Sequence, residues 1–277
     1  MTTEAQRREL GALLRARRGQ LSRAEFGLPA VGRSRTTGLR REEVSYLSGV
    51  SVTWYTWLEQ GRDISPSRQV LDAVARTLRL SPAEHAYVLS LLGYSAPVPP
   101  SPAGPGEAPG HVRRLLDALA ASPAFALTPD WGIAAWNAAY AALYPPIASV
   151  AEQDRNLLWL VFTDPYVRHL LPHWDSDSRR FLAEFRSEVG PHLGEPAVAA
   201  LVERLTGASA EFRQGWTSHD IEGFTSRERL FHHPEVGDLR LEHHRLTPSD
   251  HPELALVVYT PVADGRTPDL LAALLSG

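Results

Sequence analysis

Residues 52–60 combine small polar, apolar and aromatic side chains at helical spacing. Helical spacing would place one set on a single face: Val52, Thr53, Thr56, Trp57 and Gln60. This face offers hydroxyl, amide, methyl and ring groups and carries no charge. Such groups can form hydrogen bonds and apolar contacts with bases in a major groove. The segment therefore predicts base readout.

Arginines frame this segment on both sides. Arg40 and Arg41 open the preceding segment, whereas Arg62 and Arg68 follow. Cations at these positions suit phosphate contacts, so we predict that the four arginines hold the DNA backbone. The wider charge distribution agrees, because residues 1–93 contain 14 arginines and nine acidic residues, although the chain has a formal net charge of -4. The basic part is the candidate for binding a polyanion.

Two short helices must position these side chains. The pattern predicts helices over 40–48 and 52–60 joined by a tight turn, in which Gly49 can adopt a left-handed conformation and Ser51 can cap the second helix. The predicted contact between the helices uses apolar residues: Val44, Leu47, Val50, Tyr55 and Leu58. Further helices are expected over 4–18, 67–79 and 82–92. These five helices predict a helix-turn-helix domain that also contacts DNA through Ser51.

The chain divides at a segment rich in proline and glycine. We predict a DNA-binding domain over 1–93, a linker over 94–110 and a second domain over 111–277. In the second domain, helices are expected over 111–120, 138–143, 175–189 and 196–216. Two short strands around a Pro-Asp turn and three later strands over 226–261 predict an antiparallel sheet. The overall prediction is a multidomain protein, all-α and then α+β.

Aromatic residues are concentrated after the predicted linker. Most would belong to a core, and some would line an apolar cavity. The candidate ligand-binding residues are Trp131, Trp136, Asn137, Phe162, Trp174, Phe185, Trp216, His219 and Arg229. Of these, Asn137, His219 and Arg229 are the candidate partners of a polar head group.

Other chemistry finds less support in the sequence. The pairs His232-His233 and His243-His244 would point to opposite faces of their strands, and a hairpin turning about Val236-Gly237 would place His243 opposite Leu230. No metal site is therefore predicted. There is no cysteine, G-x-S-x-G elbow, phosphate loop or dinucleotide fingerprint, so neither catalysis nor a cofactor is predicted.

The motif GLRREEVSYLSGVSVTWYTWLEQGRDISPS resembles the signature of MmyB-like transcription regulators, including the preceding insertion GRSRTTG. The later segments TPDWGIAAWNAAY, FHHPEVGDLRLEHHRL and ELALVVYTP are similar to the entry and the closing sheet of their C-terminal domain. The resemblance implies a DNA-binding domain joined to a PAS-like domain associated with fatty-acid binding.

These observations predict a cytoplasmic homodimer that binds a double-stranded DNA operator and senses a small apolar, fatty-acid-like ligand. There is no apolar run long enough for a membrane span and no secretory signal, so no membrane association is expected. Two alternatives stay open for the second domain. It could serve only dimerisation and partner docking, or it could be a fused enzyme.

Overall fold

The computed structural model describes residues 2–28, 38–94 and 107–276. Contacts between Cα atoms divide the chain into two compact units. The first unit contains Met1–Pro97, Arg186–Ala200 and Gln214–Gly223. The second contains Val98–Phe185, Leu201–Arg213 and Phe224–Gly277. Most of the predicted linker and the arginine-bearing insertion, at 95–106 and 29–37, lie outside the described residues.

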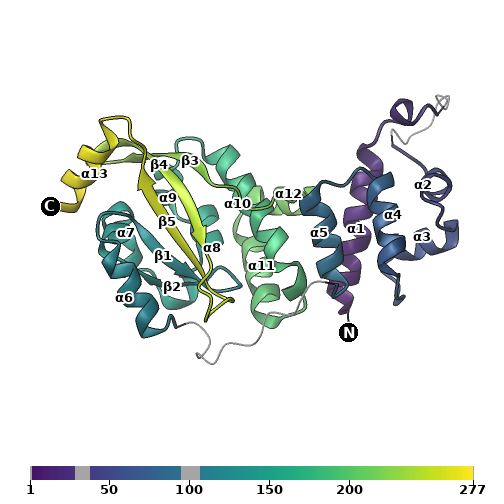
Figure 1. Cartoon of the computed structure of the whole chain (residues 1–277), viewed down its shortest axis with the longest axis horizontal. Coiled ribbons are helices and arrows are strands. Elements are labelled where there is room, and N and C mark those ends of the chain that lie inside the picture. The colour runs from purple at the N-terminus through teal and green to yellow at the C-terminus, as the bar shows by residue number, and fades with distance from the viewer. Residues whose placement is uncertain (1, 29–37, 95–106, 277) are drawn as a thin grey trace. The chain divides into compact units, whose positions relative to one another are not determined.

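Five α-helices form the N-terminal part of the first unit (Figure 1). They are α1 (Glu4–Gln20), α2 (Arg41–Ser48), α3 (Val52–Glu59), α4 (Arg68–Thr77) and α5 (Pro82–Leu91). Each contributes apolar side chains to one shared core, including Leu13, Val44, Tyr55, Leu71 and Leu91, all of which are buried. The predicted set of five helices is confirmed.

The turn between α2 and α3 has the expected local chemistry. Gly49 has a φ of 70°, in the left-handed region that glycine adopts without steric cost. Ser51 accepts a hydrogen bond from the Trp54 amide at 3.2 Å and so caps α3. The Ser45 hydroxyl donates to the Val50 carbonyl at 2.5 Å and so connects the middle of α2 to the turn.

Of the five residues predicted to be buried between α2 and α3, Leu47 is not buried, so that prediction is wrong. Leu47 is 36% exposed, whereas Val44 is fully buried. The reason is helical geometry, because Val44 and Ser45 together occupy the buried face of this two-turn helix. Leu47 lies about 110° around the helix from the middle of that face.

An antiparallel sheet organises the second unit, with strand order β2-β1-β5-β4-β3 (Figure 1). Its strands are β1 (Ala124–Leu127), β2 (Ile133–Trp136), β3 (Arg227–His233), β4 (Gly237–Leu246) and β5 (Ala255–Pro261). All five were predicted, and together with the helices they confirm the α+β class. The central strands β1 and β5 are buried on both faces, which is why β5 has no polar alternation.

Eight further α-helices follow among the residues that the structure describes. They are α6 (Gly110–Ala118), α7 (Ala138–Leu143), α8 (Leu157–Thr163), α9 (Pro165–Leu170), α10 (Trp174–Val189), α11 (Pro196–Ala208), α12 (Ala210–Ser218) and α13 (Thr267–Ser276). Short 3-10 helices occupy Arg23–Phe26, Pro145–Ala148, Glu152–Asp154 and Gly190–His192. The single helix predicted over 196–216 is two helices, because Ser209 caps α12 by accepting a hydrogen bond from the Phe212 amide.

The two faces of the sheet bury different sets of residues. On one face, α6 packs through Val112 and Leu116 against alanines of β1 and β2 and against Leu256 and Val258 of β5. On the other, Phe125 and Tyr259 meet residues of α7 to α10 around a cavity. Alternation along β1, β3 and β5 thus assigns odd-numbered residues to the cavity face, whereas in β2 the odd-numbered Ala135 lies on the α6 face.

The β3-β4 hairpin has a different register from the predicted one. His233 pairs with Gly237, so three residues form the turn, and Gly237 adopts a φ of 78°. His243 consequently lies opposite Arg227, and Leu230 lies opposite Arg240. The prediction that adjacent histidines face opposite sides holds, since His233 is buried and His232 is exposed. Among the described residues, no helix has the length and apolar character needed to cross a membrane.

Candidate DNA-binding surface and ligand cavity

One face of α3 presents an uncharged surface to solvent. Val52 and Thr53 are exposed, and Thr56 and Trp57 are half-buried. Trp54, which the sequence reasoning omitted, is also exposed and lies 6.4 Å from the Trp57 ring. Its exposure follows from the position of Tyr55, whose burial at 0% exposure sets the rotation of the helix.

The four predicted phosphate-binding arginines differ in their surroundings. Arg40 and Arg62 are exposed, and the Arg62 guanidinium lies 5.6 Å from the Trp57 ring centre. Arg68 is exposed, and its Nε lies 4.0 Å from the carboxylate of Asp72, one helical turn later. Arg41 instead donates to the buried carboxylate of Glu59 at 2.7 Å. Arg41 therefore holds the helices together, and its charge is partly neutralised within the fold.

Glu59 at the end of α3 joins three helices. Its side chain is fully buried, and its two carboxylate oxygens accept from Arg18 of α1 at 2.5 Å and from Arg41 of α2 at 2.7 Å. Burial by itself would raise the pKa of Glu59, but the hydrogen bonds from both arginines and the charge of Arg18 outweigh burial and lower it. Sequence reasoning missed this role because a glutamate at the end of an exposed helix has no local signature of burial.

An apolar cavity of about 40 Å³ lies between the sheet and helices α7 to α10. Aromatic and aliphatic side chains form nearly all of its wall: Phe125, Tyr140, Leu143, Tyr144, Leu157, Leu160, Val161, Val167, Leu170, Leu171, Phe181, Phe231 and Tyr259. The remaining residue of the wall is Arg229. Burial raises the pKa of Tyr140 and of Tyr259, so both phenols are neutral.

Arg229 is a buried cation with unused hydrogen-bonding capacity. It is 3% exposed, and its Nη1 donates to the Tyr259 hydroxyl at 3.4 Å. Its Nε and Nη2 have no acceptor among the described residues. The guanidinium stacks on Phe181 at 4.1 Å, which offsets part of the cost of burying its charge.

His243 on the neighbouring strand remains neutral beside this cation. Burial, together with the charge of Arg229, lowers the pKa of His243 to about 2. Its ring stacks on Tyr259 at 5.2 Å. Because histidine and tyrosine are both uncharged here, the positive charge of Arg229 makes this end of the cavity favourable for an anion.

Arg229 is the one predicted ligand-binding residue that lines this cavity. Trp131 and Phe185 lie one layer behind it, where Trp131 packs edge-on against Phe185 at 5.3 Å and against the cavity residue Phe181 at 6.3 Å. Phe162 packs edge-on against Phe212 at 5.3 Å.

Other predicted ligand-binding residues lie outside the cavity wall and contact other groups. Trp136 is half-buried with Arg155 5.5 Å above its ring. The Asn137 amide donates to three backbone carbonyls, and its oxygen accepts from the amides of Ala124 and Tyr140. It therefore has little capacity left for a head group. Trp216 and His219 belong to the first unit, where both contact the buried guanidinium of Arg186.

Trp174 borders a second, larger and more polar hollow of about 380 Å³. Charged and polar groups such as Arg168, Asp175 and Arg179 dominate its wall. Arg168 already stacks on Trp174 at 3.9 Å and pairs with Glu211 at 3.2 Å. Despite its size, this open hollow offers little apolar surface, so the smaller apolar cavity is the better candidate for a site that holds an apolar ligand.

The helix-turn-helix surface and the α+β unit with an internal apolar cavity define a transcription regulator that combines a DNA-binding and a ligand-binding domain. Family comparisons agree. A helix-turn-helix domain model matches residues 9–88, and the model of the MmyB-like transcription regulator ligand binding domain matches residues 108–275. The chain therefore belongs to the MmyB-like transcription regulators. No match was found among curated proteins.

Proposed function

We propose that the protein is a cytoplasmic, homodimeric regulator that binds a specific DNA operator and changes its operator affinity on binding a long-chain carboxylic acid. The observation that carries the ligand proposal is Arg229, a buried cation with two free donor nitrogens at an apolar cavity. A guanidinium can hold a carboxylate through two parallel hydrogen bonds. The cavity wall would then enclose the hydrocarbon chain, and no catalytic step is assigned.

The cavity must widen to accept such a chain. Its volume of about 40 Å³ is far below the roughly 300–1,000 Å³ of typical small-molecule sites. Long apolar side chains such as Leu160 and Leu170, with the ring of Phe181, would have to change rotamer. Burying each methylene gains about 0.8 kcal/mol, so a chain of some ten methylenes can offset this rearrangement. The widening also supplies a structural difference that a ligand can couple to DNA affinity.

The test uses the full chain and an operator selected from a pool of random duplexes. The complex is titrated with saturated fatty acids of C12 to C18, and alcohols of equal length serve as controls that lack the carboxylate. Acid binding together with changed operator affinity supports the proposal. If no acid binds, the ligand assignment fails, and if acid binds while operator affinity stays constant, the switch alone fails. Sedimentation of the same complex tests the homodimer.

Base readout by α3 predicts a selective loss on substitution. Thr53→Ala and Trp57→Ala should each weaken operator binding by about 1–3 kcal/mol and leave binding to random DNA nearly unchanged. The reason is that both side chains lie on the uncharged surface of α3 and can reach base edges. Competition binding with operator and random duplexes measures the difference. An equal loss on both kinds of DNA would contradict base readout.

Phosphate contacts by the arginines predict a change in the salt dependence of DNA affinity. Arg40→Ala and Arg62→Ala should each reduce the slope of log affinity against log salt by roughly one unit, on every DNA sequence. Arg240→Ala is the matched control, because Arg240 is an exposed arginine on β4 that pairs with Glu228. A slope that does not change would show that the arginine is only solvated.

A further inference from the structure

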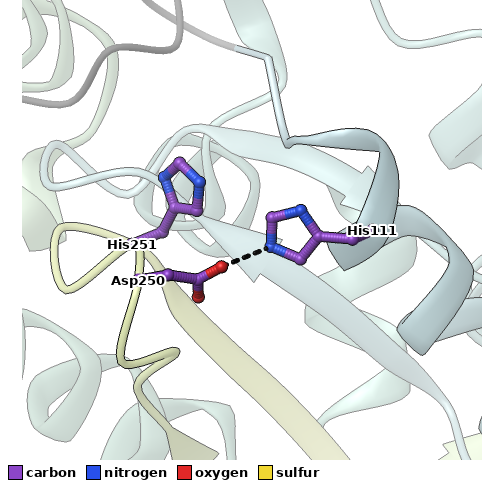
Figure 2. Close-up of side chains that lie close together, drawn as sticks. All are labelled: His111, Asp250 and His251. Atoms are coloured by element: carbon purple, nitrogen blue, oxygen red, sulfur yellow. Dashed lines mark ion pairs between the residues drawn. The ribbon is translucent and has the colours of Figure 1, made fainter.

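A cluster of two imidazoles and a carboxylate lies away from the cavity, on the second unit. His111 stands at the start of α6, whereas Asp250 and His251 belong to the loop between β4 and β5 (Figure 2). Each residue can offer one ligand atom, and these atoms lie within 4.8 Å of one another. Their positions in the sequence are about 140 residues apart, so the fold alone brings them together.

We infer that His111, Asp250 and His251 form a binding site for a divalent transition-metal ion such as Zn²⁺. Two imidazoles and one carboxylate are a ligand set that Zn²⁺ uses with water at the remaining position. The His111 Nε2 and Asp250 Oδ2 are 3.0 Å apart. Ligands of a tetrahedral Zn²⁺, each about 2.0–2.2 Å from the ion, lie about 3.4 Å from one another. The two atoms now contact each other directly and would need to separate by only about 0.4 Å to share an ion.

His251 has the support that metal-binding histidines commonly have. Its Nδ1 lies 3.1 Å from the Glu253 carboxylate, and the side chains of both residues are 12% exposed. A hydrogen bond from Nδ1–H to this carboxylate would hold the ring in place and leave Nε2 with the lone pair. The side chains of His111 and Asp250 are 45% and 64% exposed, so they can close around an ion by rotating. His251 thus provides the ordered ligand.

A comparable group on the same unit supplies a control. The ring centres of His169 and His232 are 5.4 Å apart, the same distance as between those of His111 and His251. The Asp238 carboxylate lies 2.7 Å from Nδ1 of His232. Among the described residues, however, this second group does not bring three ligand atoms within the same short distance. Both groups thus contain two histidines and one aspartate, and they differ in how closely the three ligand atoms approach one another.

Binding would connect α6 to the β4-β5 loop. Since imidazole binds a metal only in its neutral form, acid should weaken the binding. Ion binding to the folded chain also raises its thermal stability by mass action. The site is independent of the fatty-acid proposal, because none of its residues lines the cavity.

Calorimetric titration of the tag-free full chain with ZnCl₂ tests the site. We expect one ion per chain, at least tenfold weaker binding in His111→Ala and in His251→Ala, and a change within twofold in His232→Ala. Zn²⁺ should raise the melting temperature of the wild type but not that of His111→Ala, and slow amide exchange over residues 247–254. Absence of Zn²⁺ binding to the wild type, or an equal loss in His232→Ala, would overturn the site.

Cobalt provides a readout that does not depend on stability. Co²⁺ bound by nitrogen and oxygen ligands in a site of low coordination number gives visible absorption bands that hydrated Co²⁺ shows only weakly. We expect these bands with the wild type and with His232→Ala, and their loss with His111→Ala. Circular dichroism of each variant verifies its fold. Bands that persist unchanged in His111→Ala would exclude that residue as a ligand and overturn the proposed site.

Discussion

Replacing Arg229 with methionine is expected to weaken binding of C12 to C18 fatty acids about 10- to 100-fold. Hydrogen bonds between charged partners contribute about 1.5–3 kcal/mol, and methionine keeps the apolar stem while removing every donor. The fatty-acid affinity of Arg229→Lys should lie between those of the wild type and Arg229→Met, because lysine retains the charge but cannot form two parallel hydrogen bonds to a carboxylate. Calorimetry or displacement of a fluorescent fatty acid measures the affinities.

The same substitution should have little effect on stability, and this separates a ligand-binding role from a structural one. Arg229→Met removes a buried charge with two unpartnered nitrogens, which favours folding, but also removes the stacking on Phe181, which opposes it. We expect the free energy of unfolding to change by less than about 1 kcal/mol. Arg240→Met is the control, because it removes an arginine from the exposed face of the adjacent strand. Unchanged acid affinity in Arg229→Met would refute the head-group assignment.

His243 gives an independent report of an anion at Arg229. Its pKa is lowered to about 2 by burial and by nearby positive charges, Arg229 first among them. A bound carboxylate would favour the charged imidazolium and so raise this pKa. Following the His243 ring signals by NMR with and without fatty acid would show whether the head group reaches this end of the cavity.

Replacing Glu59 with glutamine is expected to destabilise the helix-turn-helix by about 3–5 kcal/mol. The change leaves Arg18 without its buried counter-charge and breaks the connection of α3 to α1 and α2. Against the roughly 5–15 kcal/mol stability of a typical domain this is a large loss, and operator binding should decline with it. Amide exchange in α3 is the direct measurement, since it reports this helix alone.

Two controls separate the buried ion pair from a general effect of removing charge. Asp72→Asn alters a partly exposed pair with His85, at 2.8 Å, and should cost less than about 1 kcal/mol. The double change Arg18→Met with Glu59→Met should be less destabilising than Glu59→Gln, because it leaves no buried charge unpaired apart from Arg41, which can turn to solvent. If α3 exchanges at the wild-type rate in Glu59→Gln, the proposed role of Glu59 is incorrect.

Acid should weaken the same contact. The pKa of Glu59 is lower in the folded protein than its ordinary value of 4.5. A lowered carboxyl pKa stabilises the fold above the unfolded pKa, and this contribution is lost as the pH falls through the folded pKa. The acid sensitivity of α3 exchange below about pH 4.5 should therefore be smaller in Glu59→Gln than in the wild type.

Local sequence signals determined the elements. The capping residue Ser51, the left-handed Gly49 and short-range apolar spacing predicted α2, α3 and the turn between them, because these interactions involve residues close in the chain. The five strands were likewise predictable from residues of high strand propensity bounded by turn residues. The helices α8, α9 and α13 were not predicted: α8 and α9 are single short helices of seven and six residues, in which few positions are available to establish a period.

Tertiary structure decided which of these side chains are available for binding. Arg40 and Arg41 are neighbours of identical type, yet Arg41 is held by a glutamate 18 residues away and Arg40 is exposed. Asn137 and Arg229 were equivalent head-group candidates, and only Arg229 has donors left at the cavity. The physical reason is that burial and hydrogen-bond partners depend on contacts between distant segments, whereas periodicity and capping are properties of a few consecutive residues.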